Sequence, residues 1–200
     1  MLDETTLPVA LKVIQGLGQT TTYNAATNLL RPIALWRLGE RYGTVAADTI
    51  EDAPATGTYT GGPTLGANSL VTGDTNGAVT FGAGKYVVIS NGIPNLTSRN
   101  VQTSAVVAEF LYTSASTNRQ TVFVGKATSA SSTKVMQIDL NYTGSASTAG
   151  HIYFSCTSTR TARRTTNAIA NLNDGNKHHV VLSQTGFWFD GALVATTDLS

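Results

Sequence analysis

The run from Asn171 to Thr196 constrains the fold more than any other part of the chain. In order it reads as a turn, a strand, a tight turn, a second strand, the dipeptide Asp190-Gly191 and a third strand. Short β-branched or aromatic runs separated by Asn, Asp and Gly are typical of hairpins, and Asp-Gly is a favoured two-residue hairpin turn. The run therefore predicts a meander of antiparallel strands at the C-terminal end.

The same pattern extends over most of the preceding chain. Short runs rich in β-branched and aromatic residues alternate with clusters of Gly, Asn, Ser or Asp, and no long helical pattern interrupts them. The expected strands are Ile33–Leu38, Gly57–Thr60, Ala67–Val71, Ala78–Phe81, Tyr86–Ser90, Ala105–Thr113, Thr121–Lys126, Lys134–Tyr142, His151–Cys156, Lys177–Gln184, Phe187–Asp190 and Leu193–Thr197. This series predicts an all-β fold, specifically a two-layer antiparallel sandwich.

The amino-acid composition indicates a globular protein with few charged residues. The chain has 200 residues, of which 41% are hydrophobic, so it can bury one sizeable core. Only 12% are charged, about half of the usual ~25%, so Thr, Ser, Asn and Gly must supply most of the polar surface. Such a surface suits extracellular β-proteins and virion proteins. A net charge of +1 gives no field that would steer the chain to nucleic acid.

Residues 1–28 differ from the rest and are expected to be an anchoring arm. Four apolar residues recur there at spacings of three and four, which is typical of one face of a short amphipathic helix. They are Leu7, Leu11, Ile14 and Leu17, and we predict that they mediate assembly. Alternating apolar residues over positions 9–13 also permit a strand. A second short helix is expected at Ala25–Leu30, and no apolar run reaches the roughly 20 residues needed for membrane insertion.

Several motifs resemble the laminin-G-like domains, which have a concanavalin A-like jelly-roll fold. Residues 34–40, Ala-Leu-Trp-Arg-Leu-Gly-Glu, look like the family's Ala-Tyr-Trp-Arg-Leu-Gly-Glu strand. Residues 73–81 resemble its Gly-Asp-Thr-Asn-x-Ala-Val-x-Phe strand, and residues 171–196 resemble its closing meander. These motifs stand in the family's order over roughly residues 29–197. The resemblance implies a jelly-roll sandwich over residues 29–200.

The chain departs from the family in two places. Gly82 stands where the family usually has Asp, and the family's further strands after the Asp-Gly-x-Leu-Val-Ala segment are missing before Ser200. An uncovered sheet edge is an aggregation hazard. We therefore expect that a partner or the arm completes the sheet, or that the sequence is a portion of a longer protein.

The segment Asn28–Glu40 also resembles jelly-roll modules of bacteriophage tail proteins. That resemblance implies a non-enzymatic virion structural protein, most simply a minor tail protein, in an oligomeric assembly with other virion or tail proteins. It also implies a surface that binds a host glycan or protein. Two alternative functions are also compatible with the sequence. One is a free extracellular carbohydrate-binding module or adhesin fragment, and the other is a capsid-decorating protein.

Catalytic chemistry is not expected. Glycoside hydrolysis needs two carboxyl groups about 5–9.5 Å apart. Glu109 and Asp139 each stand alone in an expected strand, so neither strand carries a pair of carboxylates. His178 and His179 are neighbours in a strand, so their side chains point to opposite faces and do not share a metal.

Calcium is the one cofactor that the sequence leaves open. It requires six to eight oxygen ligands, often from several acidic side chains in loops. The weak candidates are Asp48, Asp74 and Asn76. Asp and Asn are also the residues that cap turns through their side-chain oxygens, and this interpretation is favoured.

Two features are weak candidates for ligand binding. Arg160, Arg163 and Arg164 form a basic cluster that would suit an anionic glycan, a phosphate or an acidic subunit, unless it is simply a solvated hairpin. Trp188 would stack on a sugar if exposed, and its face is opposite that of Phe187 and Phe189. Three charges without interleaved aromatic residues do not indicate nucleic-acid binding.

Overall fold

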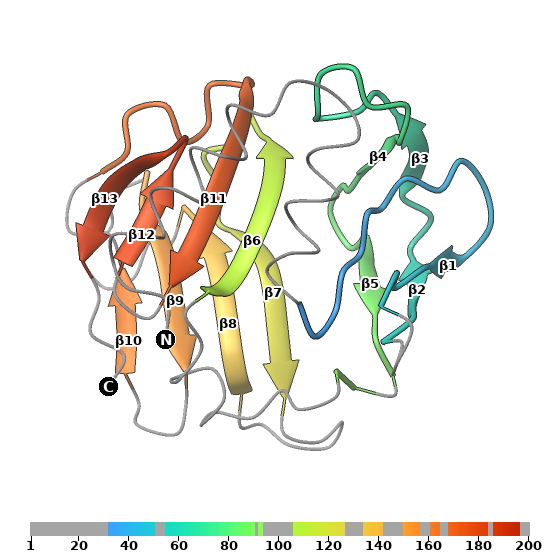
Figure 1. The fold of residues 1–200 in the computed structure, drawn as a ribbon, viewed down its shortest axis with the longest axis horizontal. Helices are drawn as coiled ribbons and strands as arrows, with labels where there is room; N and C mark the ends of the chain where they lie inside the picture. Colours follow the sequence, from blue (N-terminus) through green and yellow to red (C-terminus); the bar gives the residue numbers. More distant parts are fainter. Residues whose placement is uncertain are drawn as a thin grey trace. The chain divides into compact units, whose positions relative to one another are not determined.

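The computed structural model describes residues 32–50, 55–90, 92–93, 106–126, 134–141, 150–156, 161–164, 168–183 and 186–196 (Figure 1). These residues form strands β1 to β13, every strand pairing is antiparallel, and none of the described residues is helical. The prediction of an all-β fold is therefore confirmed. The chain forms two compact units, Met1–Asn95 and Leu96–Ser200, which are described in turn.

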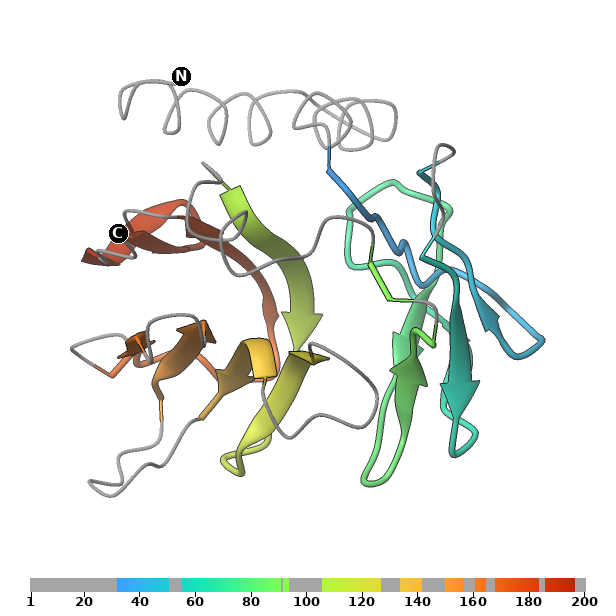
Figure 2. The same ribbon diagram turned by 90° about the horizontal axis from the view of Figure 1, so that it is seen from below.

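The second unit contains two four-stranded sheets. One has the order β13-β12-β11-β6 and the other the order β10-β9-β8-β7. The strands of the first are β6 (Val106–Thr113), β11 (Lys177–Ser183), β12 (Gly186–Phe189) and β13 (Ala192–Thr196). The strands of the second are β7 (Gln120–Lys126), β8 (Lys134–Leu140), β9 (Ile152–Cys156) and β10 (Thr161–Arg164). Figure 2 shows the two sheets as separate layers.

One hydrophobic core lies between these sheets. Alternate residues of each strand point to the same face, so the core takes every second side chain. The β7–β10 sheet contributes Met136, Ile138, Leu140, Ile152 and Phe154, the other sheet contributes Val180, Leu182, Phe187 and Phe189, and Leu172 comes from a turn. Strand β6 contributes alternate residues in the same way, because Ala108, Phe110 and Tyr112 pack against this core.

The C-terminal meander forms as the sequence predicts. Strands β11, β12 and β13 pair in succession. Asp190 and Gly191, which connect β12 to β13, both have positive φ angles, of 48° and 82°. Two successive positive φ angles are the mark of a type I′ hairpin turn, for which Asp-Gly is well suited. The fourth strand of this sheet is β6, which comes from earlier in the chain and pairs with β11.

The first unit contains two small antiparallel sheets. The larger has the order β1-β2-β5, and the smaller pairs β3 with β4. Their strands are β1 (Val45–Ala46), β2 (Gly57–Thr60), β3 (Thr64–Ala67), β4 (Ala78–Thr80) and β5 (Tyr86–Val88). Ala46, Ala55 and Tyr59 are its buried apolar residues among those described.

The strand expected at Ile33–Leu38 is wrong, and the backbone shows why. The amide of Leu35 donates to Asp48 Oδ1 (2.8 Å) instead of to a neighbouring strand. Leu38 has a φ of 53°, in the left-handed region that interrupts an extended chain. Only Trp36 remains bridged, to Asp48.

The strand expected at Ala67–Val71 is also wrong, since β3 ends where that run begins. Ser69 Oγ accepts a hydrogen bond from the amide of Val71 (3.0 Å), and Asp74 N donates to Val71 O (3.2 Å), so a turn forms. Strands β1 and β10 were not expected. The second of these runs through the Arg-rich segment, where no apolar alternation indicates a strand.

Some expectations fall on residues that the structure does not describe. The arm of residues 1–28, with Leu7, Leu11, Ile14 and Leu17, lies outside the described residues, as do the helix expected at Ala25–Leu30 and Arg160. Within the described part of the chain there is no helix with the length and apolar character to cross a membrane.

Candidate functional site

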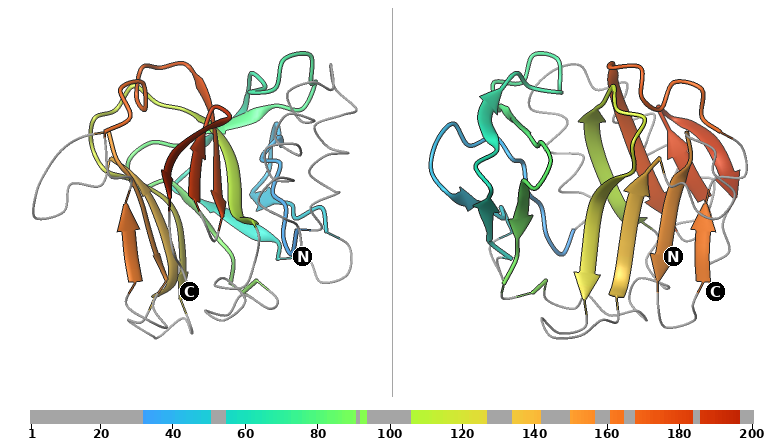
Figure 3. Two further views of the ribbon diagram at one scale, coloured as in Figure 1. Left: turned by 60° about the vertical axis from the view of Figure 1, so that its left-hand side comes forward. Right: turned by 180° about the vertical axis from the view of Figure 1, so that it is seen from behind.

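The β7–β10 sheet, which lies in front in the right-hand view of Figure 3, carries polar residues on the side away from the core. In β8 the core residues alternate with Gln137 and Asp139, which therefore point the other way. Cross-strand partners share a face. The register sets Thr121 and Tyr153 beside Asp139, and Val124 and Ser155 beside Gln137. We call these six residues the outward face.

Asp139 lies at the centre of the outward face and is fully buried (0% exposed). Arg119 Nη2 donates to Asp139 Oδ2 (2.8 Å), as does Gln137 Nε2 (2.7 Å), and Thr121 Oγ1 donates to Asp139 Oδ1 (2.6 Å). A buried carboxylate needs such partners to offset its lost hydration. The Arg119 side chain remains 44% exposed, so Asp139 holds a cationic fork in place at the surface.

The register divides the predicted basic cluster. Arg164 in β10 pairs with Tyr153, so its position extends the row that contains Asp139. Arg163 pairs with Phe154, a core residue, and so belongs to the opposite face. Neighbouring strand residues alternate between faces, which explains the division. Proximity in the sequence predicts one basic cluster or a solvated hairpin, and it does not separate the two faces of a strand.

The other sheet of this unit carries a different outward surface. His179 Nε2 lies 2.8 Å from Glu109 Oε1, and their side chains are only 14% and 9% exposed. Trp188 is half-buried and pairs with Val181 in the register, on the face opposite Phe187. The prediction that Trp188 and Phe187 face opposite ways is thus confirmed.

The two carboxylates singled out from the sequence lie far from a catalytic arrangement. The strand neighbours of Glu109 and of Asp139 pack into the same core from opposite sheets, so the two carboxylates point away from that core in opposite directions. Each is hydrogen-bonded to a basic side chain, Asp139 to Arg119 and Glu109 to His179. Glu109 and Asp139 therefore do not flank a common bond in the way that glycoside hydrolysis requires.

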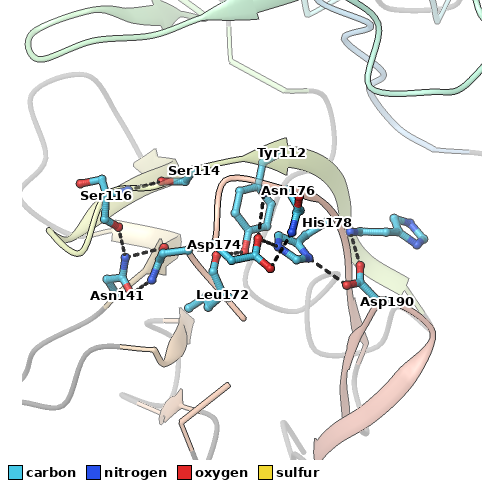
Figure 4. Close-up of polar contacts among 11 residues, drawn as sticks. Tyr112, Ser114, Ser116, Asn141, Leu172, Asp174, Asn176, His178 and Asp190 are labelled. Atoms are coloured by element: carbon cyan, nitrogen blue, oxygen red, sulfur yellow. Dashed lines mark hydrogen bonds and ion pairs between the residues drawn. The ribbon is translucent and has the colours of Figure 1, made fainter. Parts of the chain in front are cut away.

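A second polar cluster surrounds the turn at residues 171–176 (Figure 4). Tyr112 Oη donates to Leu172 O (2.7 Å), and Gly175 N donates to Ser114 O (2.9 Å). Burial is the main cause that raises the pKa of the Tyr112 phenol well above its usual range, and the charges of Asp190 and Asp174 add to this. The phenol therefore stays neutral and acts as a hydrogen-bond donor that fixes the turn.

Asn141 joins three loops in this cluster, a role that the sequence did not reveal. It is fully buried with a φ of 53°, a conformation that Asn adopts more readily than most residues. Its Nδ2 donates to Ser116 O (2.7 Å), its Oδ1 accepts from Gly150 N (3.0 Å), and its amide pairs with that of Asn173. These partners lie in distant parts of the sequence, so no local pattern indicates the role.

His178 is held at both of its ring nitrogens. Its Nδ1 lies 2.8 Å from Asp190 Oδ2, and its Nε2 lies 2.9 Å from Asp174 Oδ1. The ring stacks on Phe189 with centroids 4.7 Å apart, and the side chain is 5% exposed. His179, its neighbour, points to the opposite face, as predicted.

The calcium candidates of the first unit organise loops instead. Asp48 accepts three backbone amides, from Leu35 (2.8 Å), Ile50 (3.1 Å) and Ala55 (2.8 Å). These bonds occupy both of its carboxylate oxygens, as expected of a residue that caps a turn.

The other two candidates are held by Arg37. Asp74 Oδ2 lies 3.0 Å from Arg37 Nη2, and Asp74 Oδ1 accepts the amide of Asn76 (2.9 Å). Asn76 Nδ2 donates to Arg37 O (3.4 Å). In the described part of the chain, no three His, Cys, Asp or Glu side chains gather in a way that would hold a metal ion.

Comparisons with known proteins give no family assignment. No family model matches the chain, and neither the curated proteins nor the solved structures give a significant match.

Proposed function

We propose that the chain is a non-enzymatic structural protein of a virion, of the kind that bacteriophages carry as minor tail proteins. Residues 1–28 anchor it to other virion proteins. Residues 29–200 form a laminin-G-like jelly roll that displays a binding surface for a glycan or protein of the host. Antiparallel sheets around one core, a charged fraction of only 12% and the motifs over residues 29–197 support this proposal.

The proposed ligand-binding surface is the outward face of the β7–β10 sheet. Its polar groups stand on paired strands, which hold side chains in place more rigidly than loops do. Buried Asp139 orients the exposed side chains of Arg119 and Thr121, so these hydrogen-bonding groups are arranged before any ligand arrives. The half-buried ring of Tyr153 adds an apolar surface beside them. Polar groups next to an aromatic ring are what a sugar, with its hydroxyls and apolar ring face, requires.

The absence of catalysis is supported by the arrangement of carboxylates. Glu109 and Asp139 are on opposite sides of the core, and each is bonded to a basic side chain. A free carbohydrate-binding module is the second candidate, because the outward face lies wholly within the second unit and does not need the arm.

A bulky charge on the outward face tests the binding surface. Val124 is 39% exposed on this face, and Leu193 is 54% exposed on β13 of the opposite sheet. We expect Val124→Arg to weaken glycan binding at least about tenfold, because its side chain blocks the surface beside Gln137. Leu193→Arg is the matched control, with the same added charge, and should keep wild-type binding. The measurement is a glycan array followed by calorimetric titration of the ligand that it identifies. Equal loss in both variants, or no binding by the wild type, would contradict the proposed surface.

A further inference from the structure

His178 faces a carboxylate oxygen with each of its two ring nitrogens, at 2.8 Å and 2.9 Å. A neutral imidazole carries only one N–H, so one nitrogen would present a lone pair to a carboxylate oxygen, which repels it. An imidazolium carries two N–H groups and donates to both. The observed geometry is therefore that of the protonated ring bound between Asp174 and Asp190.

Three titratable groups face the imidazole within the described structure. Asp174 comes from the turn at 171–176, Asp190 from the β12–β13 turn, and Tyr112 from β6, with its ring centroid 5.6 Å from that of His178. The phenol of Tyr112 stays neutral, so the charge balance is set by the two carboxylates and the ring.

We propose that His178 is a pH-sensitive clamp, which in its protonated form ties the turn at 171–176 to the β12–β13 hairpin and in its neutral form releases the turn. The reaction is the loss of one proton from the ring to solvent. When the ring loses its proton, Asp190 remains bound to it, because two further hydrogen bonds hold Asp190 on β11. Its Oδ1 accepts the amide of His179 (2.8 Å), and its own amide donates to His179 O (2.9 Å). Asp174 is the partner that is released.

The energetics of the ring agree with this geometry. Burial is the largest single influence and lowers the pKa of His178, but the hydrogen bonds and charges of Asp190 and Asp174 together outweigh it, so the pKa lies above the usual 6.5. A raised pKa in the folded state means that the clamp stabilises the fold fully below about pH 6.5. That stabilisation is lost as the pH rises through the higher value of the folded protein.

Protonation of Asp174 determines the low pH at which the clamp loses its carboxylate partner. The amide of Asn176 is the main cause that lowers its pKa, from 3.8 to about 2, and the bond from His178 adds to the effect. Its contribution is present above about pH 3.8 and is lost as the pH falls towards 2. The clamp is thus closed in mildly acidic solution and opens as the pH rises through the raised pKa of His178.

An NMR titration of the full wild-type chain tests the protonation state directly. The chain has three histidines, His151, His178 and His179, whose ring signals can be assigned individually. At about pH 5.5 we expect protons on both ring nitrogens of His178, and a titration midpoint above 6.5. A single ring proton at that pH, or a midpoint below 6.5, overturns the proposal.

Hydrogen–deuterium exchange tests the opening of the turn. After correction for the intrinsic pH dependence of exchange, amides of residues 171–176 should exchange at least about tenfold faster at about pH 8.5 than at about pH 5.5 in the wild type. In His178→Gln the corrected rate should be fast at both pH values. His179→Gln, changed on the opposite face of the same strand, should keep the wild-type response. No acceleration in the wild type, or the same acceleration in His178→Gln, overturns the clamp. If His178→Gln does not fold, Asp174→Asn replaces it, and the acceleration should then disappear.

Discussion

Phe154→Ala should lower the free energy of unfolding of the second unit by about 3–5 kcal/mol. Phe154 is 1% exposed and belongs to the core that both four-stranded sheets share. Truncation removes its transfer free energy and leaves a cavity that rigid paired strands can close only in part. The measurement is urea unfolding followed by the fluorescence of Trp188, in a Trp36→Phe background so that the signal reports the second unit alone.

Leu193→Ala is the control for the core substitution. Leu193 lies in the same unit but is 54% exposed, so its truncation should change the free energy of unfolding by no more than about 0.5 kcal/mol. If both variants lost stability equally, the two sheets would not share the core described above. The contrast thus tests the packing of the sheets as well as the size of the effect.

Asp139→Ala should cost about 2–3 kcal/mol of stability. It removes the carboxylate to which the buried amide of Gln137 and the hydroxyl of Thr121 donate. The loss is smaller than for a fully buried ion pair, because Arg119 is 44% exposed and water can solvate its released guanidinium. Urea unfolding of Asp139→Ala against the wild type measures this loss.

A double-mutant cycle separates the ion pair from the rest of the cluster. Arg119→Ala combined with Asp139→Ala should be less destabilising than the sum of the single changes by about 1 kcal/mol, because the second substitution removes a partner that is already lost. Strict additivity would show that the Arg119–Asp139 contact contributes nothing to the outward face.

Sequence patterns predict the second unit better than the first. In the first unit β2, β4 and β5 lie within expected runs, whereas the runs expected at Ile33–Leu38 and Ala67–Val71 are not strands. In the second unit, β6 and β7 were expected at Ala105–Thr113 and Thr121–Lys126, within one residue of their observed bounds. In β6, alternate residues pack against the core, as the periodicity of a strand implies. In the first unit, hydrogen bonds from backbone amides to side chains compete with strand pairing. The amide of Leu35, for example, donates to the carboxylate of Asp48 and not to a neighbouring strand. A side chain that bonds a backbone amide 13 residues away leaves no periodic signal in the sequence.

The polar clusters could not be predicted from the sequence, because their residues are distant in the sequence and meet only in the fold. Asp139 was visible as a lone carboxylate, but its partners Arg119 and Thr121 lie 20 and 18 residues earlier and meet it only through the β7–β8 register. The sequence correctly set His178 and His179 on opposite faces, because that follows from the alternation of a strand alone. It did not place Asp174 and Asp190 around His178, which depends on two turns meeting.

The central claim, a virion protein anchored by its first 28 residues, is tested most directly by deleting residues 1–28. The full chain and the truncated chain would be compared by size-exclusion chromatography and by incorporation into particles. We predict that residues 29–200 stay folded, keep the far-ultraviolet spectrum of a β-protein and no longer join the particle. Incorporation of the truncated chain at the wild-type level would contradict the anchor. Unfolding on deletion would also contradict it, because the arm would then belong to the core of the domain.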